Sequence, residues 1–148
     1  YSFVVNNAGR MQRAKFMDED PADLQQSVHL NIRPYVLFSK YGALNFLKHL
    51  NEHNHKVAMI HTASIMSDLH TMPWSGVYSG TKRFNDIFAT LLNQGNKKHS
   101  DTKNLIVTQI LKPSATTTAL IGHKERWHTS NVNQVVSGSL ADIGRNST

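Results

Sequence analysis

The stretch VAMIHTAS, residues Val57–Ser64, is an apolar run that ends in small polar residues. Short apolar runs of this kind are typical of strands that are buried on both faces of a parallel sheet. Two similar runs, YSFVV at Tyr1–Val5 and LIVTQIL at Leu105–Leu111, lie on either side of it along the chain. We therefore predict three buried strands.

Helical patterns separate these runs. Apolar residues recur at three- and four-residue spacing from about Ala22 to Leu50 and again from Phe84 to Leu92, and Asn131–Gly144 has a weaker pattern of the same kind. Pro34 lies inside the first pattern. Because proline lacks an amide donor and crowds the carbonyl four residues back, we expect that helix to kink or loosen around Leu30–Asn31. Strands that alternate with helices predict right-handed β-α-β units, and hence an α/β fold with a parallel sheet covered on both faces.

The composition narrows the classes of protein that the chain could form. With 148 residues, 39% hydrophobic and 18% charged, it suits one domain with a real core. The absence of cysteine excludes disulfides and thiolate chemistry. No apolar run reaches the roughly 18 residues of a membrane span. The net charge of +6 is scattered along the chain, which favours a solvated basic surface over a nucleic-acid interface.

Small polar residues follow all three predicted strands. They are NNAG at Asn6–Gly9, TAS at Thr62–Ser64 and KPSATTT at Lys112–Thr118. Ligands of parallel α/β sheets bind beyond the carboxyl ends of the strands. Because three strand ends of this character meet at one edge, we expect a binding site there.

Tyr78 and Lys82 are spaced i, i+4 at the start of the second long helix, so both side chains lie on one helical face. A nearby ammonium lowers the pKa of a phenol, which suits Tyr78 to proton transfer with a substrate oxygen. The alternative is a lysine that packs beside a half-buried tyrosine, and spacing alone favours this alternative.

Two further residues favour the catalytic interpretation. Ser64 ends the second strand at the same edge, where its hydroxyl could orient a carbonyl substrate, although serine is also common in turns. Asn31 lies where Pro34 should disturb the helix, so a freed backbone carbonyl beside its amide could hold a water near Lys82 and supply protons.

These segments resemble, in sequence order, the motifs of the short-chain dehydrogenases/reductases, over residues 1 to about 120. The matching segments are NNAG (Asn6–Gly9), VHLN (Val28–Asn31), TAS (Thr62–Ser64), YSGTK (Tyr78–Lys82) and PSATTT (Pro113–Thr118). Within them, four residues match the catalytic Asn-Ser-Tyr-Lys tetrad of that family: Asn31, Ser64, Tyr78 and Lys82. The resemblance implies a Rossmann-type, doubly wound parallel sheet.

The resemblance also implies roles in reducing a ketone or oxidising the matching alcohol. Tyr78 would be the general acid, Lys82 would lower its pKa and hold the nicotinamide ribose, Ser64 would position the substrate oxygen, and Asn31 would support proton relay.

The implied cofactor is NADP, with NAD as an alternative. The segment Asn7, Ala8 and Gly9 would pack beside it, and Tyr78 and Lys82 would contact it. The backbone after Pro113, near Thr116, would meet its carboxamide, with the Thr118 hydroxyl nearby.

The segment VYSGTKRFNDIFATLL is similar to very-long-chain 3-oxoacyl-CoA reductases and their steroid 17β-dehydrogenase relatives. This subgroup implies a lipid-like ketone or alcohol as partner, no nucleic acid, and a place at the endoplasmic reticulum membrane or in the cytoplasm. A homodimer, and membrane contact through a segment upstream of residue 1, remain open.

The 148 residues carry no glycine-rich phosphate loop and no residue that would select NAD or NADP. About 80 residues of the family's strand–helix units are missing, at about 30 per unit. We interpret the chain as the C-terminal part of a single Rossmann-type domain, with residues 121–148 as a substrate-side and late-helix region. Alone, it is expected neither to bind NADPH tightly nor to reduce carbonyls.

Two further classes compete with a reductase. His49 and His53 are spaced i, i+4 with His55 close by, but they lie at a helix end without an obvious catalytic carboxylate set, and a favourable helix-dipole effect is the simpler explanation. We therefore predict no metal site. A truncated or degenerate family member that acts as a binding module is the remaining alternative.

Overall fold

The computed structural model describes residues 3–53, 56–69, 73–99, 105–116, 130–143 and 145, and the side chains among them except those of residues 49–53. Its three strands are β1 (Phe3–Asn6), β2 (Val57–Thr62) and β3 (Ile106–Leu111). The helices are α1 (Pro21–His53), α2 (Gly76–Lys98) and α3 (Val132–Asp142). Each predicted strand and helix is therefore present, and the largest difference is that α2 extends on both sides of the apolar pattern Phe84–Leu92.

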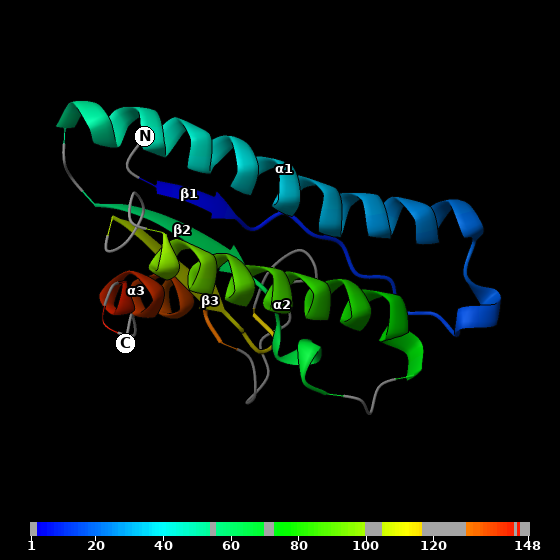
Figure 1. Ribbon diagram of the computed structural model, residues 1–148. Coiled ribbons are helices and arrows are strands. Elements are labelled where there is room, and N and C mark those ends of the chain that lie inside the picture. The colour runs from blue at the N-terminus through cyan, green and yellow to red at the C-terminus, as the bar shows by residue number, and fades with distance from the viewer. Residues whose placement is uncertain are drawn as a thin grey trace.

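The strands form one parallel sheet in the order β1-β2-β3. Val4 pairs with Met59, which pairs with Thr108. Both crossovers step in the same direction, so right-handed connections place α1 and α2 on the same face, where Figure 1 shows them side by side. This is the predicted α/β fold with a partial Rossmann-type sheet.

The opposite face of the sheet is covered over only part of its width by the described residues. Helix α3 packs there against β3, where Gln109 Nε2 donates to the Ser139 carbonyl at 3.0 Å. On the same face, Phe3 and Val5 of β1 are 59% and 49% exposed. The expectation of a sheet covered on both faces thus holds at β3 and not at β1.

Helix α1 continues through Pro34 without interruption, contrary to the expected loosening around Leu30–Asn31. One missing amide donor costs on the order of 3 kcal/mol in a helix interior. Residues on both sides of Pro34 are fixed by packing, because Asn31 and Tyr35 are 0% and 1% exposed. Tertiary contacts of these buried side chains offset the local cost.

The apolar core lies between the sheet and the two long helices. Phe46 of α1 packs with Val57 and Met59 of β2 and with Ile106 of β3. Gly42 lets α1 approach the sheet closely, because a Cβ at this position would lie 3.1 Å from Val4 Cγ2. None of the described helices has both the length and the apolar character needed to cross a membrane.

Candidate active site

The four predicted catalytic residues come from three elements that meet at the carboxyl end of the sheet. Asn31 lies on α1, Ser64 follows β2, and Tyr78 and Lys82 lie on α2. All four are at most 9% exposed. The loop after β1 passes beside them, since a Cβ on Gly9 would lie 3.4 Å from Lys82 Nζ and 3.5 Å from Asn31 Oδ1. The residues predicted for the strand-end site therefore lie together as a cluster of side chains.

Lys82 is held by the end of β2. Its Nζ donates to the Thr62 carbonyl at 2.9 Å, and the side chain is 4% exposed. No ion pair among the described residues includes Lys82. Burial without a counter-charge lowers its pKa to about 8. A substantial fraction of Lys82 is therefore neutral just above physiological pH.

Tyr78 differs from the sequence-based expectation. Burial raises the pKa of its phenol, and a hydrogen bond with Ser64 opposes that shift. Lys82 is not among the causes of this pKa shift in the structure described, where Lys82 Nζ donates to the Thr62 carbonyl. It lies 5.8 Å from the centroid of the Tyr78 ring. Ser64 is therefore the group that favours the ionised form of Tyr78.

The side chain of Asn31 is a clamp between two segments. Its Oδ1 accepts from the Arg10 amide at 2.8 Å, and its Nδ2 donates to the Arg10 carbonyl at 2.9 Å and to Thr81 Oγ1 at 3.0 Å. Arg10 is held further by an ion pair with Asp23 at 3.0 Å. Asn31 thus fixes the loop after β1 to α2.

The backbone carbonyl of Asn31 also accepts a hydrogen bond from a side chain. Asn85 Nδ2 donates to it at 3.0 Å. Asn85 is fully buried, three residues after Lys82 on α2. The sequence gives no separate signal for Asn85, because Thr81, Lys82 and Asp86 on the same buried face are polar as well.

Ser64 and the end of β3 are joined by the backbone. The amide of Ile65 donates to the Pro113 carbonyl at 3.1 Å, and Met66 N donates to Ser64 Oγ at 3.2 Å. Thr116 lies beyond, in a parallel bridge with Ser130. Of the predicted cofactor residues, Pro113 therefore lies next to the turn Ser64–Asp68, which we call the serine turn, and Thr116 pairs with Ser130. Thr118 lies outside the described residues.

A cluster of four charged residues, which we call the ion cluster, holds the serine turn on α2. Arg83 Nη1 contacts Asp68 at 3.1 Å and Asp86 at 3.0 Å, and Lys112 Nζ contacts the same carboxylates at 3.0 and 2.9 Å. A hydrogen bond with Lys112 lowers the pKa of Asp68. Arg83 and Asp86 are spaced i, i+3 on α2, so their pairing could be expected from the sequence. Asp68 and Lys112 come from other segments, so their place in the cluster could not.

His61 is a buried titratable group that sequence reasoning missed. It is 0% exposed, and burial lowers its pKa to about 4. Asn6 Nδ2 lies 3.3 Å from His61 Nδ1 and donates to Ser39 Oγ at 3.0 Å. The ring packs against Tyr35 and Phe88 with centroid distances of 5.9 and 6.3 Å. His61 is therefore a neutral core residue.

The histidine group around His53 lies where side chains are not described. Among the side chains that the structure does describe, no group of three or more metal-ligating residues forms a candidate metal site.

Comparisons with known sequences and structures agree on one protein family. The family model for short chain dehydrogenases matches residues 2–129. No curated protein sequence matches the chain significantly. Among solved structures, an alcohol dehydrogenase from Comamonas testosteroni that is specific for bulky-bulky ketones aligns with a TM-score of 0.78 and 20% identity, covering 99% of this chain and 52% of that one.

Two further structures have the same fold. A short-chain dehydrogenase from Sphingobium yanoikuyae in complex with NADPH aligns with a TM-score of 0.80 and 20% identity, covering 97% of this chain and 54% of that one. An NADPH-bound carbonyl reductase from chicken fatty liver aligns with a TM-score of 0.74 and 21% identity, covering 94% and 56%. The chain spans about half the length of these structures. With its family model matching residues 2–129, the chain belongs to the short-chain dehydrogenase family.

Proposed function

We propose that the chain carries the catalytic end of an NAD(P)-dependent oxidoreductase that reduces a ketone or oxidises the matching alcohol. The observation that carries this proposal is the meeting of Ser64, Tyr78 and Lys82 at one end of the sheet, beside Gly9. Family membership supports the same class of reaction.

The described residues fit a nicotinamide cofactor. Asn7, Ala8 and Gly9 are exposed at the end of β1, and the missing side chain of Gly9 leaves room next to Lys82. Pro113 and Thr116 border the neighbouring strand end, and Thr118 is proposed to join them. When bound, the nicotinamide would supply or accept hydride. We propose NADP, supported by two NADPH-bound structures of the same fold, with NAD as the alternative because a similar reductase structure contains NAD.

The residues divide the remaining work. Tyr78 is positioned to donate a proton to a substrate oxygen or remove one, while Ser64 hydrogen-bonds the phenol and can orient the same oxygen. Lys82 supplies a cation whose charge is adjustable near neutral pH, because its pKa is about 8. Asn31 acts through the loop after β1, which it holds next to Lys82.

A lipid-like substrate, such as a 3-oxoacyl-CoA or a steroid, remains the finer proposal. Its support is the resemblance of the segment around Tyr78 to the 3-oxoacyl-CoA reductase and steroid 17β-dehydrogenase subgroup. The competing proposal is a member without turnover that acts as a binding module. A ketone panel that runs from acetoacetyl to long-chain and steroid substrates separates them, because only a lipid reductase shows kcat/KM rising with apolar size.

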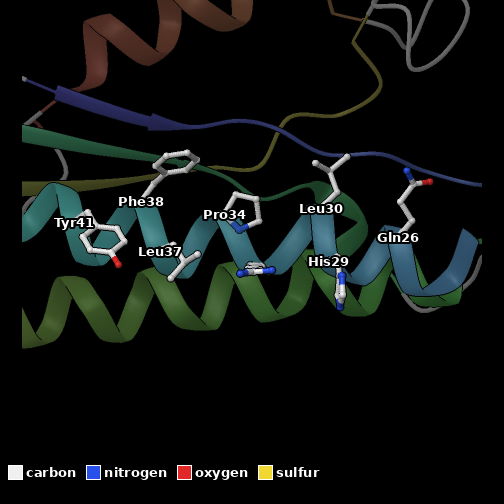
Figure 2. Close-up of a pocket in the computed structure, with 8 residues that line it drawn as sticks. Gln26, His29, Leu30, Pro34, Leu37, Phe38 and Tyr41 are labelled. Carbon is white, nitrogen blue, oxygen red and sulfur yellow. The ribbon is translucent and has the colours of Figure 1, made fainter. Parts of the chain in front are cut away.

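The outward side of α1 supports a homodimer. Leu37, Phe38 and Tyr41 are 39%, 60% and 64% exposed there. They help to line an open hollow of about 540 Å³, and Figure 2 shows their side chains projecting from the helix. The hollow includes no residue of the catalytic cluster, so it is better suited to a second copy than to substrate. Phe38→Glu should convert a dimer to a monomer in light scattering, whereas a protein that is monomeric without the substitution would contradict this.

Substitution of Tyr78 tests the reaction. In protein expressed from its full coding sequence, Tyr78→Phe should lower kcat for NADPH-dependent ketone reduction by about 10²–10⁴-fold, because the proton donor is lost. Tyr41→Phe, on the outward side of α1, is the matched control and should retain activity. Equal turnover by the two variants would contradict the proposed role.

Cofactor binding has its own readout. Titration of the 148-residue chain with NADPH should shift the amide resonances of Gly9, Ser64 and Lys82, even if binding is weak. An unchanged spectrum at these positions, with millimolar NADPH, would contradict the proposed cofactor site.

A further inference from the structure

The inner side of Lys82 is lined by a second tyrosine. Tyr35 of α1 is 1% exposed, and its hydroxyl donates to the Thr62 carbonyl, the same oxygen that accepts from Lys82 Nζ. Lys82 Nζ lies 5.6 Å from the centroid of the Tyr35 ring, close to its 5.8 Å distance from the Tyr78 ring. The ammonium is thus placed between two aromatic rings, with one shared acceptor.

Asn85 closes the same side from α2. Its Nδ2 donates to the Asn31 carbonyl at 3.0 Å, and a hydrogen bond from Asn85 lowers the pKa of the Tyr35 phenol against the larger effect of burial. Its Oδ1 is buried and has no partner among the described residues. Asn85 therefore fills the space next to the Asn31 carbonyl and connects it with the Tyr35 hydroxyl.

We propose that Tyr35 and Asn85 are positioning residues that form a water-excluding inner wall behind Lys82. The wall holds the ammonium at the Thr62 carbonyl and directs its accessible side toward Gly9 and Tyr78. This inference rests on the proposed function only for its catalytic meaning, since the wall is a property of the folded chain.

The wall has a measurable electrostatic consequence. The titratable groups that face Lys82 are Tyr35 from α1 and Tyr78 from α2, both of whose pKa values are raised by burial, so both are neutral at neutral pH. His61 from β2 packs against Tyr35 and is kept neutral by its low pKa. No carboxylate of the described ion pairs contacts Lys82. Exclusion of water is therefore the main cause of its low pKa, and admission of water should raise that pKa.

The experiment opens the wall and follows Lys82 directly. The ¹³Cε shift of Lys82 is recorded against pH by NMR in the chain and in Asn85→Ala. We expect the midpoint to rise from about 8 by about one unit or more, because water enters the space left by the amide and solvates the ammonium. Asn85→Leu, which keeps the volume and excludes water, should leave the midpoint low.

Tyr35→Phe tests the other half of the wall. It keeps the ring but removes the competing donor, so the Thr62 carbonyl is left to Lys82 alone and the midpoint should also rise. Asn96→Ala is the matched control, because Asn96 is a buried asparagine of the same helix whose amide contacts Thr108 Oγ1 at 3.4 Å, away from Lys82. It should leave the midpoint unchanged.

Two results would overturn the proposal. One is a midpoint that stays constant in both Asn85→Ala and Tyr35→Phe. The other is a rise in Asn96→Ala as large as in Asn85→Ala, which would indicate general loosening. If Asn85→Ala does not fold, Asn85→Leu and Tyr35→Phe decide the matter. None of these readouts needs turnover, so an inactive protein would contradict the proposed function and leave the wall testable.

If the protein is active, its kinetics also distinguish a positioning role of Asn85 from a merely structural one. Asn85→Ala should displace the pH profile of kcat upward in parallel with the NMR midpoint while KM changes little. A fall in kcat at an unchanged pH profile would indicate structural damage and contradict positioning of Lys82.

Discussion

Around Asn31–Tyr41, the two sides of helix α1 reverse the usual distribution of polar and apolar residues. The side that faces the sheet and α2 buries polar residues, with Asn31, Tyr35 and Ser39 all at most 1% exposed. The outward side exposes apolar ones, with Phe38 and Tyr41 at 60% and 64%. Burial of polar groups is tolerated only where they find hydrogen-bond partners. The inner side is therefore a surface that needs specific hydrogen-bond partners, whereas the exposed apolar side chains of the outer side need none.

The largest expected effect is the pH dependence of stability that is caused by His61 of β2, which packs against the inner side of α1. His61 has a folded pKa of about 4 against 6.5 when unfolded, so the unfolded state binds more protons between these values. Stability should thus fall by about 3 kcal/mol as the pH drops from about 6.5 to about 4.

This acid dependence is checked by urea denaturation at several pH values. His61→Gln should flatten the curve over that window, whereas His29→Gln on the exposed outer side should not. Equal curves for the two variants would show that burial of His61 does not control acid stability.

Removal of the Asn31 clamp should have the next largest effect. Asn31→Ala deletes three hydrogen bonds from a fully buried side chain and leaves the Arg10 amide and carbonyl without this partner. We expect a loss of about 2–4 kcal/mol in the free energy of unfolding. Phe38→Ala on the outer side, measured in dilute protein, should cost less than about 1 kcal/mol. Similar losses for both would remove the contrast between the two sides.

Glycine-to-alanine substitutions compare a closely packed position of α1 with an open position of α2. Gly42→Ala should destabilise by about 1 kcal/mol, because its Cβ would lie 3.1 Å from Val4 Cγ2. Gly80→Ala on α2 meets nothing within 4 Å and should stabilise by about 0.5–1 kcal/mol, since alanine favours the helix. Thermal denaturation gives both signs, and a stabilising Gly42→Ala would show that α1 can move away from β1.

The smallest effect is expected for the ion cluster. Asp68 is 45% exposed, so Asp68→Asn should shift Tm by less than about 2 °C, and 1 M salt should remove the difference. Because its pKa is lowered in the folded state, the contribution of Asp68 is present above its unfolded value of 3.8 and is lost as the pH falls below it. A larger shift that persists in salt would mean that the cluster supports the serine turn by geometry.

The predictable part of the fold and site follows from local patterns. Periodicity in the sequence identified three strands and both long helices, because apolar residues recur at a different spacing in strands and in helices. The order of the motifs also indicated that Ser64, Tyr78 and Lys82 would meet, since strand ends converge at one edge of a parallel sheet. The uninterrupted helix at Pro34 was not predicted, because distant packing outweighs a local penalty.

The sequence by itself determined the α/β class, the family and the set of residues at the strand ends. Only the tertiary structure decided which atoms these residues contact: Lys82 turns to the Thr62 carbonyl, and Asn85 reaches the Asn31 carbonyl from 54 residues away. The physical reason is that residue spacing is a local property, whereas these contacts join segments that are distant in the sequence. Spacing records whether a segment is a strand or a helix, whereas the face that it buries and the hydrogen bonds on that face depend on how separate elements approach each other in space.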